Sequence, residues 1–343
     1  MAEEVTKLNK KYDGFIKMPG SDYIGEYRYI STGSLAVDMI IGPRGQVNGI
    51  PRGVITTIWG KEGGGKSTFV ANCMAEAQKV GRVAFANTEL KFDPAYFSRV
   101  GVDIKELTVI DLACHNNIFG EQIGQAIVAL AKSGEYSMIV CDSAAALIPK
   151  RVAESEVGES NPGLRARLIK DIIERLISPI KHNDVAMMFT THRASNFDAI
   201  GFGAPRYNIV GGTALLFYSA VVGRIDFLKQ IKNNAKVPIG IQSKITLQKN
   251  IGITFGTADF SITDGLGIDK VQELFDFGDA AYGKGGWYYY KHPETGEEVR
   301  LANGKEAAIA ALRADSVLLN ALIAKQRAAL EGRTIQGSSE VED

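Results

Sequence analysis

A glycine-rich stretch, GKEGGGKST, carries the residue types that bind phosphate groups in proteins. It fits the pattern G-x-x-x-x-G-K-[ST], in which backbone N–H groups surround the phosphates of a nucleotide. Lys66 would place a positive charge at the β- and γ-phosphates, and the hydroxyl of Ser67 would ligate Mg²⁺. The sequence therefore predicts a site for ATP and Mg²⁺. The residues expected to bind the nucleotide here are Gly60, Lys61, Glu62, Gly63, Gly64, Gly65, Lys66, Ser67 and Thr68.

Two carboxylates at the ends of apolar runs would complete this site. Asp142 ends the run SMIVCD, which is the position of a second metal ligand in such sites. Its alternative role is to cap the following helix. Glu89 ends the run RVAFANTE, and in a parallel sheet its side chain would emerge at the same edge as the glycine loop. There it could orient an attacking water, whereas the alternative is a solvated loop glutamate.

The elements around these residues alternate between strand and helix. The β-rich run GVITTIWG precedes the loop, and a helix begins near Lys66, so its positive end points at the phosphates. Most strands are apolar throughout, which is typical of a parallel sheet covered on both faces. The fold class is therefore α/β, a P-loop ATPase core with a mostly parallel central sheet.

The chain divides into four parts by composition. We expect a short N-terminal helical segment at 1–32, the ATPase core at 33–265, a small α+β domain at 266–335 and an acidic tail at 336–343. The last domain is indicated by a change of character after about residue 265, including the run GGWYYYK and a long terminal helix.

Charge and cysteine content restrict the partners and the compartment. The 343 residues include 39 basic and 39 acidic side chains, so any nucleic-acid grip must come from local groups of basic residues. The three cysteines form no C-x-x-C pair, which favours buried free thiols and a reducing compartment. We find no signal peptide and no run of 18 apolar residues, so we expect a cytoplasmic protein without a membrane span.

Several motifs, the glycine loop among them, occur in the order typical of one protein family. ISTGSLAVD, GKEGGGKST, NTELKFDPAYFSRVGVD, MIVCDSAAALIPK, GGTALLFYS and GGWYYYK fall at the spacing of the RecA recombinases, bacterial and phage-encoded. The chain resembles this family over roughly residues 12–330. The resemblance implies a RecA-like core, a helical filament of copies on DNA, and ATP lying between neighbouring protomers.

The resemblance also assigns roles to individual residues. Glu89 falls on the catalytic glutamate of the family, while Asp93 and Tyr96 fall on its adenine contacts. Asp142 and Ser143 fall on the metal-side strand end, where Ser143 is expected to help bind the nucleotide. Phe217, Tyr218 and Lys249 fall at protomer contacts, although ALLFY taken alone is typical of a core helix.

Two polar segments match the DNA-binding loops of the family, at about 154–167 and 193–212. Arginines beside aromatic residues suit single-stranded DNA, because charge follows the backbone while rings stack on bases. The alternative for the first segment is an ordinary surface loop. The residues expected to contact DNA are Arg165, Arg167, Arg193, Phe202, Arg206, Gly211 and Gly212.

His192 stands between the preceding strand and the second loop, where the family usually has glutamine. With Glu89 and Lys66 it completes the expected catalytic set, as the switch that links ATP to the DNA loop. Other departures affect ATP turnover. The paired lysines of the family are replaced by Gln248 and Asn250, with Lys249 between them, and Asn87 lacks the usual carboxylate.

These features together predict a DNA-dependent ATPase that pairs homologous DNAs, with single- and double-stranded DNA and copies of itself as partners. Two alternatives stay open at this stage. One is a hexameric helicase of the same fold, and the other is an ATP-binding filament protein with little turnover.

Overall fold

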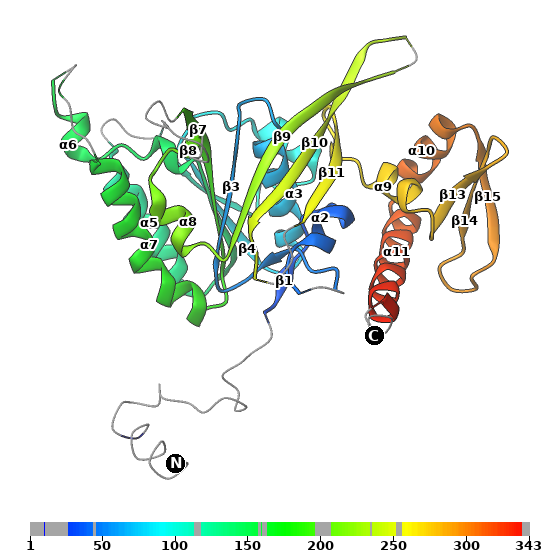
Figure 1. Ribbon diagram of the computed structural model, residues 1–343, viewed down its shortest axis with the longest axis horizontal. Coiled ribbons are helices and arrows are strands. Elements are labelled where there is room, and N and C mark those ends of the chain that lie inside the picture. Colours follow the sequence, from blue (N-terminus) through cyan, green and yellow to red (C-terminus); the bar gives the residue numbers. More distant parts are fainter. Residues whose placement is uncertain are drawn as a thin grey trace, which may run out of the picture.

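The computed structural model describes residues 10, 27–43, 46–112, 118–156, 159, 163–195, 207–233, 235–251 and 256–337 (Figure 1). The predicted N-terminal helix lies almost wholly outside these residues, as does most of the predicted acidic tail. The described chain forms one large sheet flanked by helices and a smaller group of elements at its C-terminal end.

One half of the large sheet is parallel, as predicted from its apolar strands. Its strands run in the order β9-β3-β7-β6-β4-β5. Strand β3 lies near the middle and is buried along its whole length. The bounds are β3 Ile55–Gly60, β4 Arg82–Asn87, β5 Leu107–Asp111, β6 Tyr136–Asp142, β7 Ala186–Ser195 and β9 Val221–Lys232.

Helices cover both faces of this half. Successive side chains along each strand point to opposite faces, so each strand contributes to two separate hydrophobic cores. Ile58 and Val140 face one core, which they share with Phe69 of the helix after the glycine loop. Their strand neighbours Trp59 and Cys141 face the other core. The first face carries α2 Leu35–Ile40, α3 Lys66–Gln78 and α4 Pro94–Val100, and the second carries α5 Gly120–Ser133, α7 Leu164–His182 and α8 Thr213–Tyr218.

The other half of the sheet is antiparallel. Strands β9 and β10 form a long hairpin that projects beyond the sheet in Figure 1. Buried and less buried residues alternate along β11, so only one of its faces packs on the core. The bounds are β10 Pro238–Lys249, β11 Thr257–Thr263 and β12 Gly267–Ile268. The short elements are β1 Tyr29–Ile30, β2 Ile50–Pro51, β8 Tyr207–Ile209, the 3₁₀ turn Ala144–Ala146 and α6 Lys150–Ala153.

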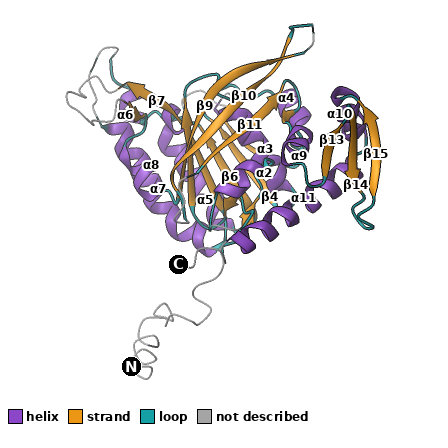
Figure 2. Ribbon diagram, turned by 45° about the vertical axis from the view of Figure 1, so that its right-hand side comes forward, coloured by secondary structure: helices purple, strands orange, loops and turns teal. Residues whose placement is uncertain are grey.

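The predicted C-terminal α+β group is present as a three-stranded antiparallel sheet packed on helices (Figure 2). No single described helix is long and apolar enough to cross a membrane, and only α10 with the first part of α11, bent by 106°, pass that test as a pair. The bounds are α9 Lys270–Phe277, β13 Ala281–Lys284, β14 Trp287–Lys291, β15 Glu298–Asn303, α10 Lys305–Ala314 and α11 Ser316–Gly337.

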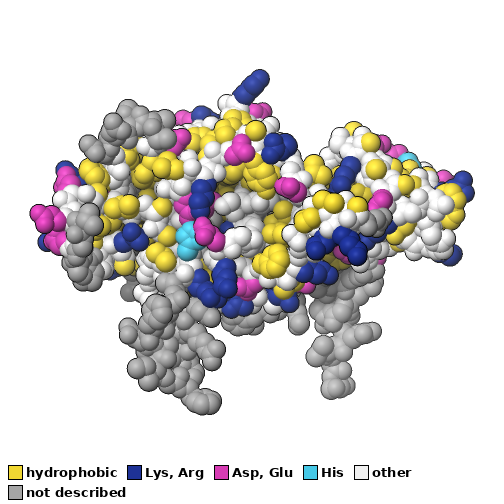
Figure 3. All heavy atoms as spheres, turned by 90° about the horizontal axis from the view of Figure 1, so that it is seen from above, with side chains coloured by type: hydrophobic (Ala, Val, Ile, Leu, Met, Phe, Trp, Pro, Cys, Tyr) yellow, Lys and Arg dark blue, Asp and Glu magenta, His cyan; other side chains and the backbone are white. Residues whose placement is uncertain are grey.

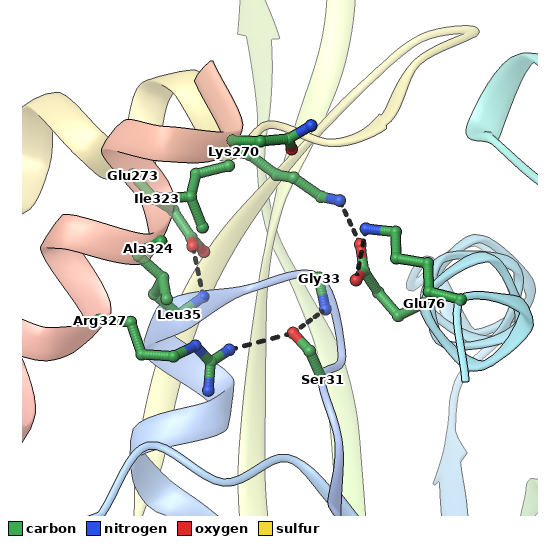
Figure 4. A pocket seen from close by; sticks show the side chains of 11 residues that line it. Ser31, Gly33, Leu35, Glu76, Lys270, Glu273, Ile323, Ala324 and Arg327 are labelled. Atoms are coloured by element: carbon green, nitrogen blue, oxygen red, sulfur yellow. Dashed lines mark hydrogen bonds and ion pairs between the residues drawn. The ribbon is translucent and has the colours of Figure 1, made fainter. Parts of the chain in front are cut away.

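Charged side chains join this group to the core around a cavity of about 300 Å³ (Figure 4). Lys270 of α9 lies 2.5 Å from Glu76 of α3, so the helix that follows the glycine loop is tied to the C-terminal group. Glu273 accepts hydrogen bonds from Ser34 Oγ and from the backbone N–H of Leu35, at 2.5 and 2.7 Å.

Candidate active site

The glycine loop lies where β3 ends and α3 begins, at the carboxyl edge of the parallel strands. Lys66 is buried, and its Nζ donates to the carbonyl oxygens of Gly60 and Lys61 at 3.1 and 2.8 Å. Burial lowers the pKa of Lys66, and the carboxylates of Asp142 and Glu89 oppose that effect. When a phosphate enters, the ammonium group of Lys66 can exchange these carbonyl contacts for a phosphate oxygen, because the N-terminus of α3 also attracts an anion.

Gly60 and Gly65 must be glycines because other parts of the chain lie too close to leave room for a side chain at either position. A methyl group at Gly60 would lie 2.1 Å from the carbonyl oxygen of Ile225 on β9, which is far inside contact distance. Gly65, the N-cap of α3, has a φ of 89°, and a methyl group there would lie 2.5 Å from Ile262 Cδ1. The backbone can therefore follow this path only without side chains at these two positions.

Asp142 ends β6 beside the loop, as the sequence predicts. Its Oδ2 accepts a 2.9 Å hydrogen bond from Ser67 Oγ, and its Oδ1 accepts one from Thr190 Oγ1. Burial raises the pKa of Asp142, while these two hydroxyls lower it. A hydroxyl and a carboxylate side by side suit a hard cation that keeps several waters. The described residues hold no cluster of three or more His, Cys, Asp or Glu fit for a metal, so its other ligands would be water and phosphate oxygens.

Glu89 is brought to the same edge and is held by three neighbours. Its Oε1 accepts a 2.5 Å hydrogen bond from Ser143 Oγ and contacts His192 Nε2, and Lys91 Nζ lies 3.3 Å from its Oε2. Burial by itself would raise the pKa of Glu89, but the hydrogen bonds from Ser143 and His192 outweigh it, so the pKa lies below its ordinary value. Glu89 is thus a carboxylate at neutral pH.

Strand register places His192 beside both the glycine loop and Glu89, because β7 pairs with β3 on one side and with β6, the neighbour of β4, on the other. In the parallel pairing of β3 with β7, His192 stands opposite Gly60, the first residue of the loop. Its side chain is half-buried and lines the same cavity as Lys66, Ser67 and Asp142. Three predicted catalytic residues and the predicted metal ligands therefore surround one cavity of about 350 Å³.

The residues predicted to contact adenine lie next to this cavity. Asp93 caps the N-terminus of α4 by accepting from the N–H groups of Ala95 and Tyr96. The hydroxyl of Tyr96 lies 2.5 Å from Thr68 Oγ1, at the loop end of α3. Ser143 is fully buried behind Glu89.

Sequence reasoning missed Lys91, which lines the cavity between Glu62 and Glu89. The only signal for it was a lysine two residues after the strand-end glutamate, outside the glycine loop.

A family model described as the RecA N-terminal domain matches residues 1–269 of the chain. The chain belongs to the RecA family. Protein RecA of Chloroherpeton thalassium is 34% identical over 345 residues, which cover 98% of this chain and 91% of that protein. Protein RecA of a Nitratiruptor species is 36% identical over 317 residues, covering 90% and 87%. The RecA fold and an ATPase function in DNA recombination and repair are thereby confirmed, against the helicase alternative.

In this RecA-family chain, the C-terminal ends of the two predicted DNA loops lie together. Arg165 and Arg167 are in the first turn of α7, and Arg193 is in β7, opposite Ile209 of β8. A methyl group at Gly212 would lie 2.8 Å from Ala166 Cβ, so the end of the second loop packs on the helix that follows the first. Phe202 and Arg206 lie outside the described residues.

The residues predicted at the protomer contact lie on and beside α8. The side chain of Phe217 is 75% exposed, unusual for a phenylalanine. Tyr218 donates to Glu174 of α7 at 3.0 Å. Lys249 donates to the carbonyl oxygens of Leu216 and Phe217, at 3.4 and 2.7 Å, so it holds the C-terminal end of α8.

Charges of both signs are mixed over the face of the molecule seen in Figure 3, with no wide field of one sign. This agrees with the formal net charge of zero. A DNA contact on such a surface must rely on local arginines and on main-chain N–H groups.

Proposed function

We propose that ATP and Mg²⁺ bind in the cavity between the glycine loop, Asp142 and Glu89. Main-chain N–H groups of the loop and Lys66 would hold the phosphates, and Ser67 and Asp142 would hold the metal. Mg²⁺ would neutralise charge on the phosphate oxygens when bound. Asp93 and Tyr96 are assigned to the adenine, and their position beside the Thr68 end of α3 supports this.

Glu89 is proposed to orient the water that attacks the terminal phosphate, which yields ADP and inorganic phosphate. Its lowered pKa supports this role, because a charged carboxylate accepts a hydrogen bond from water at neutral pH. Ser143, which donates to the same carboxylate oxygen, would keep the side chain in position.

The observation that carries the proposal is the contact between His192 and Glu89. His192 directly precedes the second predicted DNA loop, 193–212, and β7 continues into that loop as far as Ser195. A terminal phosphate arriving beside Glu89 would compete for His192 Nε2. We infer that its transfer from Glu89 to the phosphate shifts the end of β7 and the loop that follows.

The shifted loop, with Arg193, Gly211 and Gly212, is proposed to grip single-stranded DNA and present it to duplex DNA for pairing. Arg165 and Arg167, at the end of the first predicted loop, are proposed to take part in the same contact. Copies of the chain would form a helical filament through the exposed Phe217 and its neighbours. We assign the protein to the cytoplasm, with support from the buried free thiols of Cys73 and Cys141.

Single-stranded DNA binding with and without a non-hydrolysable ATP analogue tests this coupling. His192→Ala should still bind the analogue, but its DNA affinity should no longer rise when the analogue is present. His182→Ala, at the exposed end of α7, is the matched control and should behave like wild type. A normal rise in DNA affinity for His192→Ala would refute the proposed link.

A further inference from the structure

Lys91 occupies a position at the mouth of the nucleotide cavity that the glycine-loop motif does not explain. Its Nζ lies 3.0 Å from Glu62 Oε1 and 3.3 Å from Glu89 Oε2, so one ammonium group bridges the glycine loop and the end of β4. The chain reaches this point through Leu90, whose φ of 56° is uncommon for a residue other than glycine. Such a backbone conformation is often found at functional sites.

Lys91 is one of two lysines that balance the negative charge of the carboxylates around the cavity. Three carboxylates line it, from Glu62, Glu89 and Asp142, whereas Lys66 and Lys91 are the only lysines among the described residues that line it. Lys66 is buried at the base, while the side chain of Lys91 is 62% exposed. An incoming nucleotide adds further negative charge beside Glu62 and Glu89, and Lys91 is the lysine placed to offset it there.

We propose that Lys91 donates to the terminal phosphate of bound ATP, as a second lysine supplied by the same protomer. The inference rests on the proposed nucleotide site. The exposed ammonium has three N–H donors, so it can keep its contact with Glu89 and exchange Glu62 for a phosphate oxygen. Lys91 would then hold the terminal phosphate next to the carboxylate that orients the water.

The ionisation of the three groups agrees with this arrangement. Hydrogen bonds to Glu62 and Glu89 raise the pKa of Lys91, and the hydrogen bond from Lys91 lowers the pKa of Glu62. All three groups are therefore charged at neutral pH. In this arrangement Lys91 would also distinguish nucleotides, because it would contact the terminal phosphate that ADP lacks, whereas Lys66 at the base of the loop would bind ATP and ADP alike.

Equilibrium binding of ADP and of adenylyl imidodiphosphate, each with Mg²⁺, tests the proposal. In Lys91→Met the preference for the triphosphate over ADP should fall by about tenfold or more, the usual effect of losing a hydrogen bond to a charged group. Lys91→Arg should keep most of the preference. Lys105→Met, an exposed lysine at the opposite edge of the sheet just before β5, should match wild type.

The double variant Lys91→Met with Glu62→Gln removes one charge of each sign, so the net charge of the cavity stays the same. It therefore distinguishes a direct contact of Lys91 with the phosphate from an effect of net charge. If Lys91 contacts the phosphate, the double variant should also lack the preference. Recovery of the preference, or an equal effect of Lys91→Met on both nucleotides, would overturn the proposal. Tighter binding of both nucleotides by Lys91→Met would overturn it as well, since Lys91 would then only obstruct the cavity. If Lys66→Ala binds both nucleotides as wild type does, the proposed site itself is wrong, and this outcome is distinct from the others.

Discussion

Replacing Glu273 by glutamine should change how the stability of the protein depends on pH. Glu273 is 5% exposed and accepts hydrogen bonds from Ser34 Oγ and the N–H of Leu35. Burial raises its pKa from 4.5 to about 8, although these hydrogen bonds lower it. The folded protein therefore keeps a proton on Glu273 at pH values where the unfolded chain has released it.

The direction of the effect follows from this difference. Below pH 4.5 the carboxyl group is protonated in both states, and its contribution to stability is complete. As the pH rises towards 8 the unfolded state is increasingly favoured, and above about pH 8 the loss becomes constant. At about 1.4 kcal/mol for each pH unit, this interval sets an upper limit of about 5 kcal/mol.

Urea unfolding of wild type and Glu273→Gln at pH 5 and pH 8.5 measures the effect. Glutamine does not titrate, so the variant should gain stability relative to wild type between the two pH values, by up to about 4 kcal/mol, because part of the effect is already lost at pH 5. Glu106→Gln, an exposed glutamate before β5, controls for the titration of other groups. Parallel curves of stability against pH for wild type and Glu273→Gln would refute the claim that buried Glu273 keeps its proton where the C-terminal group contacts the core.

Three further substitutions test other contacts. Gly60→Ala should cost about 1–3 kcal/mol or more in urea unfolding, because the added methyl forces β3 away from the carbonyl of Ile225; an unchanged midpoint would contradict this. Asp142→Asn should raise the melting temperature of the nucleotide-free protein by removing a buried carboxylate, and should abolish the rise caused by Mg-ATP; a normal rise would mean that the metal binds elsewhere. Lys249→Met should weaken α8 by about 0.3–1 kcal/mol and speed amide exchange at its end, near Phe217, and unchanged exchange there would exclude the contact.

The nucleotide loop can be predicted from the sequence because its requirements are local. Phosphate binding needs backbone N–H groups, a lysine and a hydroxyl at fixed spacing, and the residues from Gly60 to Thr68 provide them in one run. The convergence of Asp142 and Glu89 on that loop follows from a general property of parallel sheets, whose strands carry functional residues at their carboxyl ends.

The contacts that govern the site could not be predicted in the same way. His192 and Glu89 are 103 residues apart, and their contact depends on the register of β7 against β6 and of β6 against β4. Ser34 and Glu273 are 239 residues apart, so nothing near either one indicates that α9 caps α2. Lys91 is at the cavity because the chain turns at Leu90, and a leucine gives no sign of such a turn.

DNA strand exchange by wild type and Lys66→Ala, each with and without ATP, tests the central claim most directly, namely that nucleotide in the glycine loop controls the grip on DNA. We predict exchange only for wild type with ATP, because Lys66 is the buried cation of the phosphate site. Exchange by wild type without nucleotide, or by Lys66→Ala at the wild-type rate, would contradict it.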